Sequence, residues 1–245
     1  MKLLAFETAT EACSVALWIN GDVRERFELA SRRHAELALP WAEQLLAEAG
    51  IAKSQLDAIA VGRGPGAFTG VRLAVALAQG IALALDRPIV PVSTLAALAA
   101  SSLPLPLAGK GWGEGMPGRR VLASIDARMN EVYSGAFELR DGDAIALTGE
   151  AVGAPATVQL PDDRDGWLGV GTGFGAAGNA LQAHLAGRFA AIDATALPHA
   201  ADVARLAVTA FARGESVAPE RVEPAYLRDN VALTLAEQQA LHAKR

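Results

Sequence analysis

Three consecutive β-strands are predicted within LLAFETATEACSVALWINGDVRERFEL, the segment of residues 3–29. Apolar residues dominate 3–7 and 13–19, while 23–29 alternates between apolar and charged residues. Asn20-Gly21 separates the second run from the third, and this dipeptide favours two-residue hairpin turns. The chain is therefore expected to open with a meander of three neighbouring strands.

Helices and strands alternate after this meander. The expected elements of the first half are a helix at about 35–49 that Gly50 would cap, a strand at 58–62, a helix at about 69–85, a strand at 88–92 and a helix from about 94. The second half is expected to contain strands at 121–126, 131–139, 144–147 and 167–170, and helices near 176–185 and at 200–212. Both halves open with a meander, which predicts a duplicated α/β fold with two mixed sheets. This arrangement resembles that of the actin-like ATPase (ASKHA) superfamily.

A segment rich in proline and glycine separates the two halves. Its residues of these types are Pro104, Pro106, Gly109, Gly111, Gly113, Gly115, Pro117 and Gly118. Such a segment cannot propagate a helix or a sheet ladder. We therefore expect an N-terminal half at 1–103, a linker at 104–119 and a C-terminal half at 120–245.

The composition is that of a folded globular protein and excludes several function classes. Of 245 residues, 51% are hydrophobic and 20% are charged. A net charge of −5 disfavours a chain that grips nucleic acid by itself. The single cysteine excludes an internal disulfide and suggests a reducing compartment, so we expect the cytoplasm. The uncharged run 88–109 has the length of a membrane span, but four prolines within it argue against a spanning helix, and no membrane association is expected.

Three turns are candidates for nucleotide binding. The loop GRGPGAFTG at 62–70 connects a strand to a helix, where backbone N–H groups can bind phosphate. It lacks the ending of a P-loop and fits a dinucleotide fingerprint only loosely, so a structural tight turn is favoured. Glu7 and Thr8 belong to the turn after the first strand. Their side chains could contact a phosphate group or its metal ion, or they could form hydrogen bonds with the backbone of the turn. Gly171 and Gly173 would line a facing cleft, although a plain connection is favoured. These four residues are weak candidates, and no cofactor site is assigned.

Conventional catalytic sets are not found in the sequence. Ser134 lies outside any G-x-S-x-G motif, and Cys13 lies inside a predicted strand, where a buried structural thiol is favoured. The four histidines are His34, His184, His199 and His242. None of them forms the i, i+4 pair that a helical metal site needs, so we assign no catalytic or metal-binding residue.

Two predicted helices are apolar on more than one side. Leu37, Trp41 and Leu45 recur at i, i+4 and i+8 on the first of them, and the second is almost free of charge over residues 73–85. Either the core of this chain or a partner must cover these faces. The residues alone favour the core.

Several blocks together resemble the TsaB family, a bacterial component of tRNA threonylcarbamoyladenosine biosynthesis. The blocks are LAFETATEACSVAL at 4–17, residues 62–80 ending in AQG, VSTL at 92–95, IDARMNEVY at 125–133 and EPAYLRDNVA at 223–232. They occur in the family's order and span almost the whole chain, so their combination is specific.

The resemblance implies a two-domain actin-like fold and a subunit without a transferase site of its own. In this family the subunit forms a heterodimer with its paralogue TsaD, which transfers a threonylcarbamoyl group to the adenosine next to the tRNA anticodon. The ATPase TsaE joins the complex and uses the ATP. A homodimer is also implied, and tRNA would be contacted only indirectly.

The resemblance further implies the loss of a metal site. TsaD holds its metal with two histidines at i and i+4, and the matching positions here are Thr94 and Leu98. Neither side chain replaces imidazole as a transition-metal ligand. Many family members have Asp where this chain has Glu7, a departure to which we attach little functional weight.

The family also implies that the two apolar helices pack against the same helices of a second subunit, in a four-helix interface. On the basis of the resemblance, part of each helix is therefore expected to face a partner and not the core of this chain. The residues expected on the partner face are Leu37, Trp41, Leu45, Val71, Arg72, Val75 and Gln79. Homodimer and heterodimer would use overlapping surfaces and compete.

The alternative function is an autonomous ATP-dependent kinase or ATPase that uses Glu7 and the glycine-rich loops, and an endopeptidase ranks last.

Overall fold

The structure is a computed structural model and describes residues 1–102 and 118–228. The predicted linker at 104–119 therefore lies almost wholly outside the described residues, as does His242.

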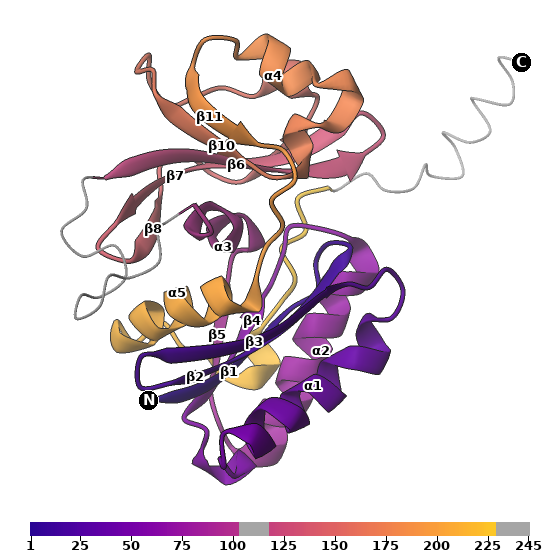
Figure 1. The fold of residues 1–245 in the computed structure, drawn as a ribbon, viewed down its shortest axis with the longest axis vertical. Coiled ribbons are helices and arrows are strands. Elements are labelled where there is room, and N and C mark those ends of the chain that lie inside the picture. Colours follow the sequence, from indigo (N-terminus) through magenta and orange to yellow (C-terminus); the bar gives the residue numbers. More distant parts are fainter. Residues whose placement is uncertain (103–117, 229–245) are drawn as a thin grey trace, which may run out of the picture.

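The first sheet has five strands in the order β3-β2-β1-β4-β5 (Figure 1). They are β1 (Lys2–Glu7), β2 (Ala12–Ile19), β3 (Asp22–Leu29), β4 (Ala58–Gly62) and β5 (Ile89–Val92). The strands β1, β2 and β3 form the predicted antiparallel meander, and Asn20 and Gly21 both take positive φ in its hairpin. β4 and β5 extend the sheet in parallel from β1.

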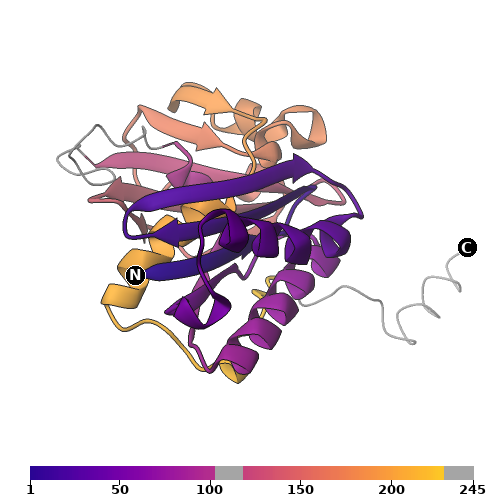
Figure 2. The ribbon, with the colours of Figure 1, turned by 60° about the horizontal axis from the view of Figure 1, so that its bottom comes forward.

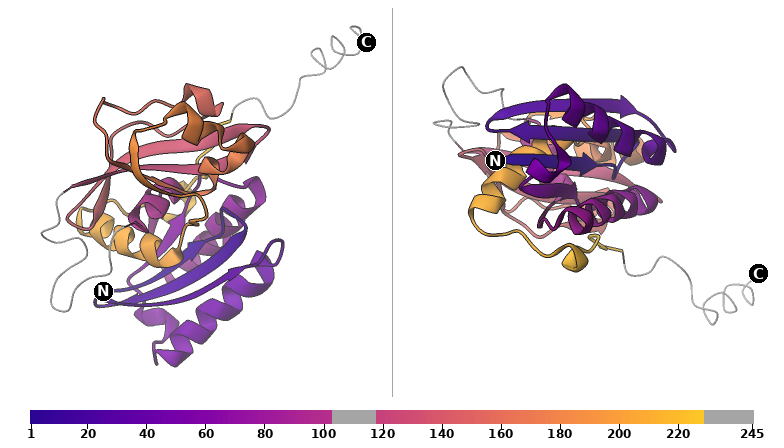
Figure 3. Two further views of the ribbon diagram at one scale, coloured as in Figure 1. Left: turned by 45° about the horizontal axis from the view of Figure 1, so that its top comes forward. Right: turned by 90° about the horizontal axis from the view of Figure 1, so that it is seen from below.

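Two helices cover the outer face of this sheet. Figure 2 shows α1 (His34–Glu48) and α2 (Phe68–Leu85) side by side on that face, and the view from below in Figure 3 shows the same layer. Each helix connects two parallel strands, as a crossover must. Their inward side chains form one apolar cluster with strand residues such as Phe6, Leu17 and Ile59.

The second sheet repeats the topology of the first. Its strands are β6 (Arg119–Arg128), β7 (Glu131–Arg140), β8 (Asp143–Ala146), β10 (Trp167–Val170) and β11 (Phe189–Asp193), with β9 (Ala151–Gly153) paired to β7. Read as β8-β7-β6-β10-β11, it matches β3-β2-β1-β4-β5, with an antiparallel meander extended by parallel strands. The predicted fold class, two mixed sheets in an actin-like arrangement, is confirmed.

The last helix of each half packs against the sheet of the other half. α3 (Thr94–Ala100) follows β5 but lies against β6, β7 and β8, and α5 (Ala200–Ala212) follows β11 but lies against β1 and β2 (Figure 1). The two helices also contact each other, so a single apolar core fills the space between the sheets. The predicted C-terminal half, 120–245, therefore includes a helix that packs with the first sheet, because the chain returns there after β11.

The described chain ends in residues 217–228, which contain one 3-10 turn (Pro219–Arg221) and which we call the C-terminal strap. Val217 pairs with Ile89 at the edge of the first sheet, and the side chain of Gln79 on α2 donates hydrogen bonds to two strap carbonyl groups. The guanidinium of Arg228 then donates to the carbonyl oxygen of Ala127, at 3.2 Å, in the second half. The strap thus joins α2 to the turn between β6 and β7.

Two regions differ from the prediction. The helix expected near 176–185 is short 3-10 turns followed by α4 (Ala180–His184), because Ala177 and Asn179 take positive φ and interrupt it. β11 and β9 were not predicted. The sequence of β11, FAAID, has few β-branched residues, and β9 has only three residues, so neither gives a strand signal.

Candidate functional site

Glu7 lies at the end of β1 and is fully enclosed. Its carboxylate accepts hydrogen bonds from the backbone N–H of Ala9, at 2.7 Å, and from the hydroxyl of Thr94, at 2.9 Å. The same Thr94 oxygen accepts from the N–H of Gly64, at 3.2 Å. Thr94, one of the two positions where the paralogue would have a histidine, therefore serves as a partner for an internal carboxylate. Glu7 ties three segments of the first half together and does not face an open cleft.

Burial raises the pKa of Glu7 to about 7, against the lowering effect of these hydrogen bonds. Between pH 4.5, the ordinary pKa of a glutamate side chain in water, and pH 7, the folded chain keeps a proton that the unfolded chain has released. The free energy of unfolding should therefore fall across this window, by about 3 kcal/mol at about 1.4 kcal/mol per pH unit, and then level off.

We expect Glu7→Gln to lose this part of the pH dependence. The variant should be more stable relative to wild type at pH 8 than at pH 5, which urea unfolding at the two pH values measures. Other groups titrate in both proteins and cancel in the comparison. Glu11→Gln, an exposed neighbour in the same turn, is the control and should keep the wild-type profile. An equal stability difference at both pH values would contradict the assignment.

The glycine-rich loop at 62–70 packs against the turn after β1. The hydroxyl of Thr8 donates to the carbonyl of Gly70 at 2.7 Å, and the N–H of Ala67 donates to the carbonyl of Ala9 at 2.7 Å. A Cβ atom at Gly70 would lie 2.0 Å from the Thr8 carbonyl oxygen, and one at Gly66 would lie 2.4 Å from that of Ala9. The glycines thus permit close contact between two backbone segments, which is the tight-turn interpretation.

Gly171 and Gly173 make the corresponding contact in the second half. Gly171 has a φ of +106°, and a Cβ atom there would lie 2.2 Å from the carbonyl oxygen of Ser124 on β6 and 2.5 Å from the side chain of Leu98. At Gly173 it would lie 2.1 Å from the Ser124 hydroxyl. Leu98 on α3, which the family resemblance would match to the second histidine, therefore packs into the region where a nucleotide cleft was expected.

The other titratable candidates are structural. His34 begins α1, and its ring nitrogen lies 3.1 Å from the carbonyl oxygen of Thr10. His199 pairs with Glu25 at 3.0 Å, just before α5, and His184 contacts the carbonyl of Val158. Burial raises the pKa of Cys13 to about 11, which keeps its thiol protonated. Over residues 1–102 and 118–228 there is no group of three or more metal-ligating side chains.

The structure places the residues of the predicted partner face in different environments. Leu45, Val71 and Val75 are buried within this chain, with exposed fractions of 1%, 4% and 4%, so they offer little surface to a partner. Sequence periodicity identified the apolar sides of the helices but did not distinguish the inner side from the outer one. Leu37 and Trp41 are half-buried.

The remaining two predicted residues are accessible. Arg72 is exposed, and its guanidinium stacks 3.4 Å from the centre of the Phe68 ring and donates to the hydroxyl of Tyr226 on the strap, at 2.7 Å. Gln79 is half-buried, and its side-chain amide is held by the strap. Both side chains therefore link α2 to the strap.

The outer side of these helices nevertheless carries large apolar side chains. Leu83 is 61% exposed, Phe68 is 56% exposed and Leu39 on α1 is 44% exposed. The sequence contained this signal, since α2 has no acidic residue and only one basic one. By length and composition α2 could cross a membrane, but here it packs lengthwise on the first sheet. Its exposed apolar side is a candidate protein-binding surface.

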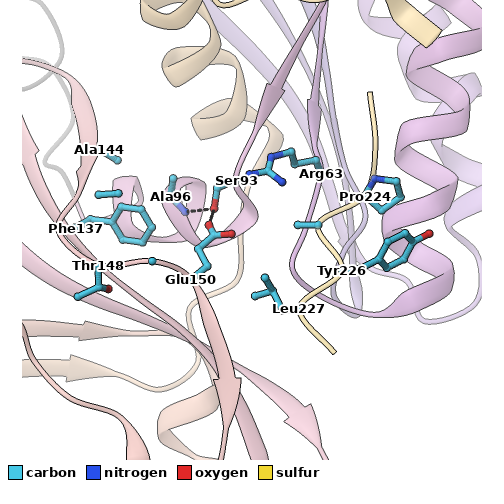
Figure 4. Close-up of a pocket in the computed structure, with 13 residues that line it drawn as sticks. Arg63, Ser93, Ala96, Phe137, Ala144, Thr148, Glu150, Pro224, Tyr226 and Leu227 are labelled. Carbon is cyan, nitrogen blue, oxygen red and sulfur yellow. Dashed lines mark hydrogen bonds between the residues drawn. The ribbon is translucent and has the colours of Figure 1, made fainter. Parts of the chain in front are cut away.

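A cavity of about 630 Å³ opens between the two halves, at the N-terminal end of α3, where Ser93 caps the helix (Figure 4). Arg63, after β4, and Ser93, after β5, line it from the first half, and Glu150 lines it from the second. The strap lines it with residues 224–227, and β7, β8 and the loop after β8 supply further lining residues. None of these residues was among the predicted site residues, because their types and spacing form no motif.

Comparison with known proteins gives consistent results. The family model described as "TsaD: tRNA N6-adenosine threonylcarbamoyltransferase" matches residues 28–235. The chain is 40% identical to the tRNA threonylcarbamoyladenosine biosynthesis protein TsaB of Escherichia coli K12, over 95% of this chain and 96% of that protein. It is 35% identical to TsaB of Haemophilus influenzae, over 94% and 95% of the two chains. The solved structure of YeaZ from Pseudomonas aeruginosa superposes with a TM-score of 0.81 at 46% identity, over 92% of this chain and 99% of that one.

Proposed function

Because this chain belongs to the TsaB family and takes part in tRNA threonylcarbamoyladenosine biosynthesis, we propose that it is a non-catalytic subunit that pairs with and activates the threonylcarbamoyltransferase TsaD. In this proposal TsaE joins the complex and supplies ATP turnover. The chain works in the cytoplasm, and the tRNA is held mainly by the partner.

The exposed apolar side of α2 carries this proposal. A helix of 18 residues with one charged residue, only partly covered by its own chain, leaves apolar side chains in water. Large exposed apolar patches on soluble proteins mark sites of association. α1 and α2 lie together on one face, so a partner with a similar helix pair can bury both in a four-helix contact (Figure 2). The same surface serves a homodimer, and the two pairings compete.

The interior contacts support a non-catalytic role. Thr94 and Leu98 occupy the metal-ligand positions of the paralogue, where one bonds to Glu7 and the other packs against Gly171. The carboxylate of Glu7 is hydrogen-bonded inside the protein, where it does not reach a substrate. These contacts disfavour the alternative of an autonomous kinase or ATPase.

Reconstitution tests the proposal. The purified chain, given tRNA and threonylcarbamoyl-adenylate, should form no modified adenosine, and TsaD alone should form little. Adding this chain with TsaE and ATP to TsaD should restore multiple turnovers, because the subunit is required and not itself the catalyst. Modified adenosine in digested tRNA is measured by mass spectrometry.

Parallel reactions separate the alternatives. Substantial transfer by this chain alone would contradict the non-catalytic role, and full TsaD activity without this chain would contradict activation. Phosphate release from ATP by the chain alone, lost in Glu7→Ala, would support the autonomous ATPase.

A further inference from the structure

The cavity between the halves is built from several parts of the chain (Figure 4). Arg63 and Ser93 reach it from the ends of two parallel strands of the first sheet, and Glu150 reaches it from the loop before β9. Leu227 gives it an apolar wall, and the core residue Phe137, which is only 2% exposed, lies beneath it. Its volume of about 630 Å³ lies within the range of small-molecule sites. Glu7, Thr8, Gly171 and Gly173, the weak nucleotide-binding candidates of the sequence, do not line it.

Arg63 supplies an unused cation at the cavity. Its backbone is fixed, because its N–H donates to Val92 and its carbonyl accepts from the N–H of Ala225 at 2.8 Å. Its guanidinium, in contrast, has neither a hydrogen bond nor an ion pair with any side chain of the described residues, and it acts on Glu150 only through its charge. A guanidinium presents a planar fork of donors that matches a carboxylate or phosphate group. This fork remains available to a ligand.

Glu150 supplies an acceptor beside this cation. One of its carboxylate oxygens accepts a hydrogen bond from the hydroxyl of Ser93, which itself accepts from the N–H of Ala96 at 3.1 Å. This chain of bonds orients the carboxyl group. Burial raises its pKa, against the lowering effects of Ser93 and Arg63. Its second oxygen has no hydrogen-bond donor within the described part of the chain and lies at the cavity.

The charge balance of the cavity selects among anionic ligands. A nucleotide polyphosphate carries several negative charges and is normally met by several cations or by a helix N-terminus in a glycine-rich loop. Here a single guanidinium lies near a carboxyl group, and the lining also includes the apolar side chain of Leu227 and the hydroxyl groups of Ser93 and Thr148. A small molecule with one carboxylate, one hydrogen-bond donor and an apolar body complements all three features.

We propose that this cavity binds a free α-amino acid with an aliphatic side chain, its carboxylate on Arg63, its ammonium group on the free oxygen of Glu150 and its side chain against Leu227. None of the residues that would contact the ligand lies on α1 or α2, so binding does not require the proposed pairing with TsaD. Binding can therefore be tested on the isolated full-length chain.

The experiment is an amide NMR titration of the full chain with three matched probes. L-leucine carries both polar groups, leucinamide lacks the carboxylate, and 4-methylpentanoate lacks the ammonium group. Leucine should shift the amides of Ser93, Glu150 and residues 225–227 in a saturable manner. Each analogue should bind at least about tenfold more weakly, because one charge-assisted contact is lost. ATP is the fourth probe and should not shift these amides.

Variants assign the contacts to residues. Arg63→Met should weaken leucine binding at least about tenfold, while Arg24→Met, an exposed arginine on β3, should leave it unchanged. If Arg63→Met does not fold, the probe comparison on the wild-type chain decides. Equal binding of leucine and both analogues, shifts confined to other residues, preferential binding of ATP, or the absence of any shift would each overturn the proposal.

Discussion

Gly70→Ala is expected to lower the free energy of unfolding by about 3 kcal/mol or more, although it adds only one methyl group. A Cβ atom at this position would lie 2.0 Å from the carbonyl oxygen of Thr8. That oxygen belongs to the backbone of a turn whose own hydroxyl is bonded to the Gly70 carbonyl, so it cannot move without breaking the contact between β1 and α2. Urea unfolding followed by circular dichroism measures the effect.

Gly80→Ala is the matched control on the same helix. Nothing lies within 4 Å of a Cβ atom at Gly80, and alanine is favoured over glycine inside a helix by about 1 kcal/mol. This variant should therefore be slightly more stable than wild type. A Gly70→Ala protein as stable as Gly80→Ala would show that the packing of the glycine-rich loop on the first turn is wrong.

Leu83→Glu is expected to weaken the pairing with TsaD by roughly a hundredfold, and to dissociate any homodimer. Leu83 is 61% exposed on the outer side of α2, so the change should leave the fold intact. Burying an unpaired carboxylate in an apolar contact is strongly unfavourable. Co-purification with tagged TsaD and calorimetric titration measure the loss, and unfolding experiments confirm that the variant is folded.

The choice of residue matters for this test. Val75→Glu, which the sequence pattern suggests, would place a charge in the core of the first half and would destabilise the chain itself. Ile145→Glu, which adds the same charge to a partly exposed apolar residue on β8, is the control and should pair normally. Undiminished pairing of Leu83→Glu with TsaD would refute the assignment of this face.

The sequence predicted most of the fold because its signals are local. Asn20-Gly21 specified the hairpin between β2 and β3, and apolar periodicity specified the helices within one residue at most ends. The short β9 and the alanine-rich β11 carry no such signal, because their pairing is decided by the neighbouring strands. The break in the helix near 176–185 depends on positive φ at Ala177, which no residue preference predicts.

The sites were less predictable because they depend on contacts far apart in the sequence. Thr94 reaches Glu7 because β1 and β5 end at the same edge of the first sheet. Local sequence patterns do not predict how close these two residues lie. The cavity joins Arg63 to Glu150 across the two halves. Both sides of α2 carry apolar residues, so the sequence does not distinguish Val75 from Leu83. In the structure Val75 is buried and Leu83 is exposed.

The placement of α3 on the second sheet and of α5 on the first has a thermodynamic consequence. Neither half can bury the inner face of its own sheet without the last helix of the other, so an isolated half would expose that face to water. The protein should therefore melt in one cooperative transition, with calorimetric and van't Hoff enthalpies that agree. In energetic terms the two halves should therefore behave as one cooperative unit, and loss of either exchanged helix should destabilise both.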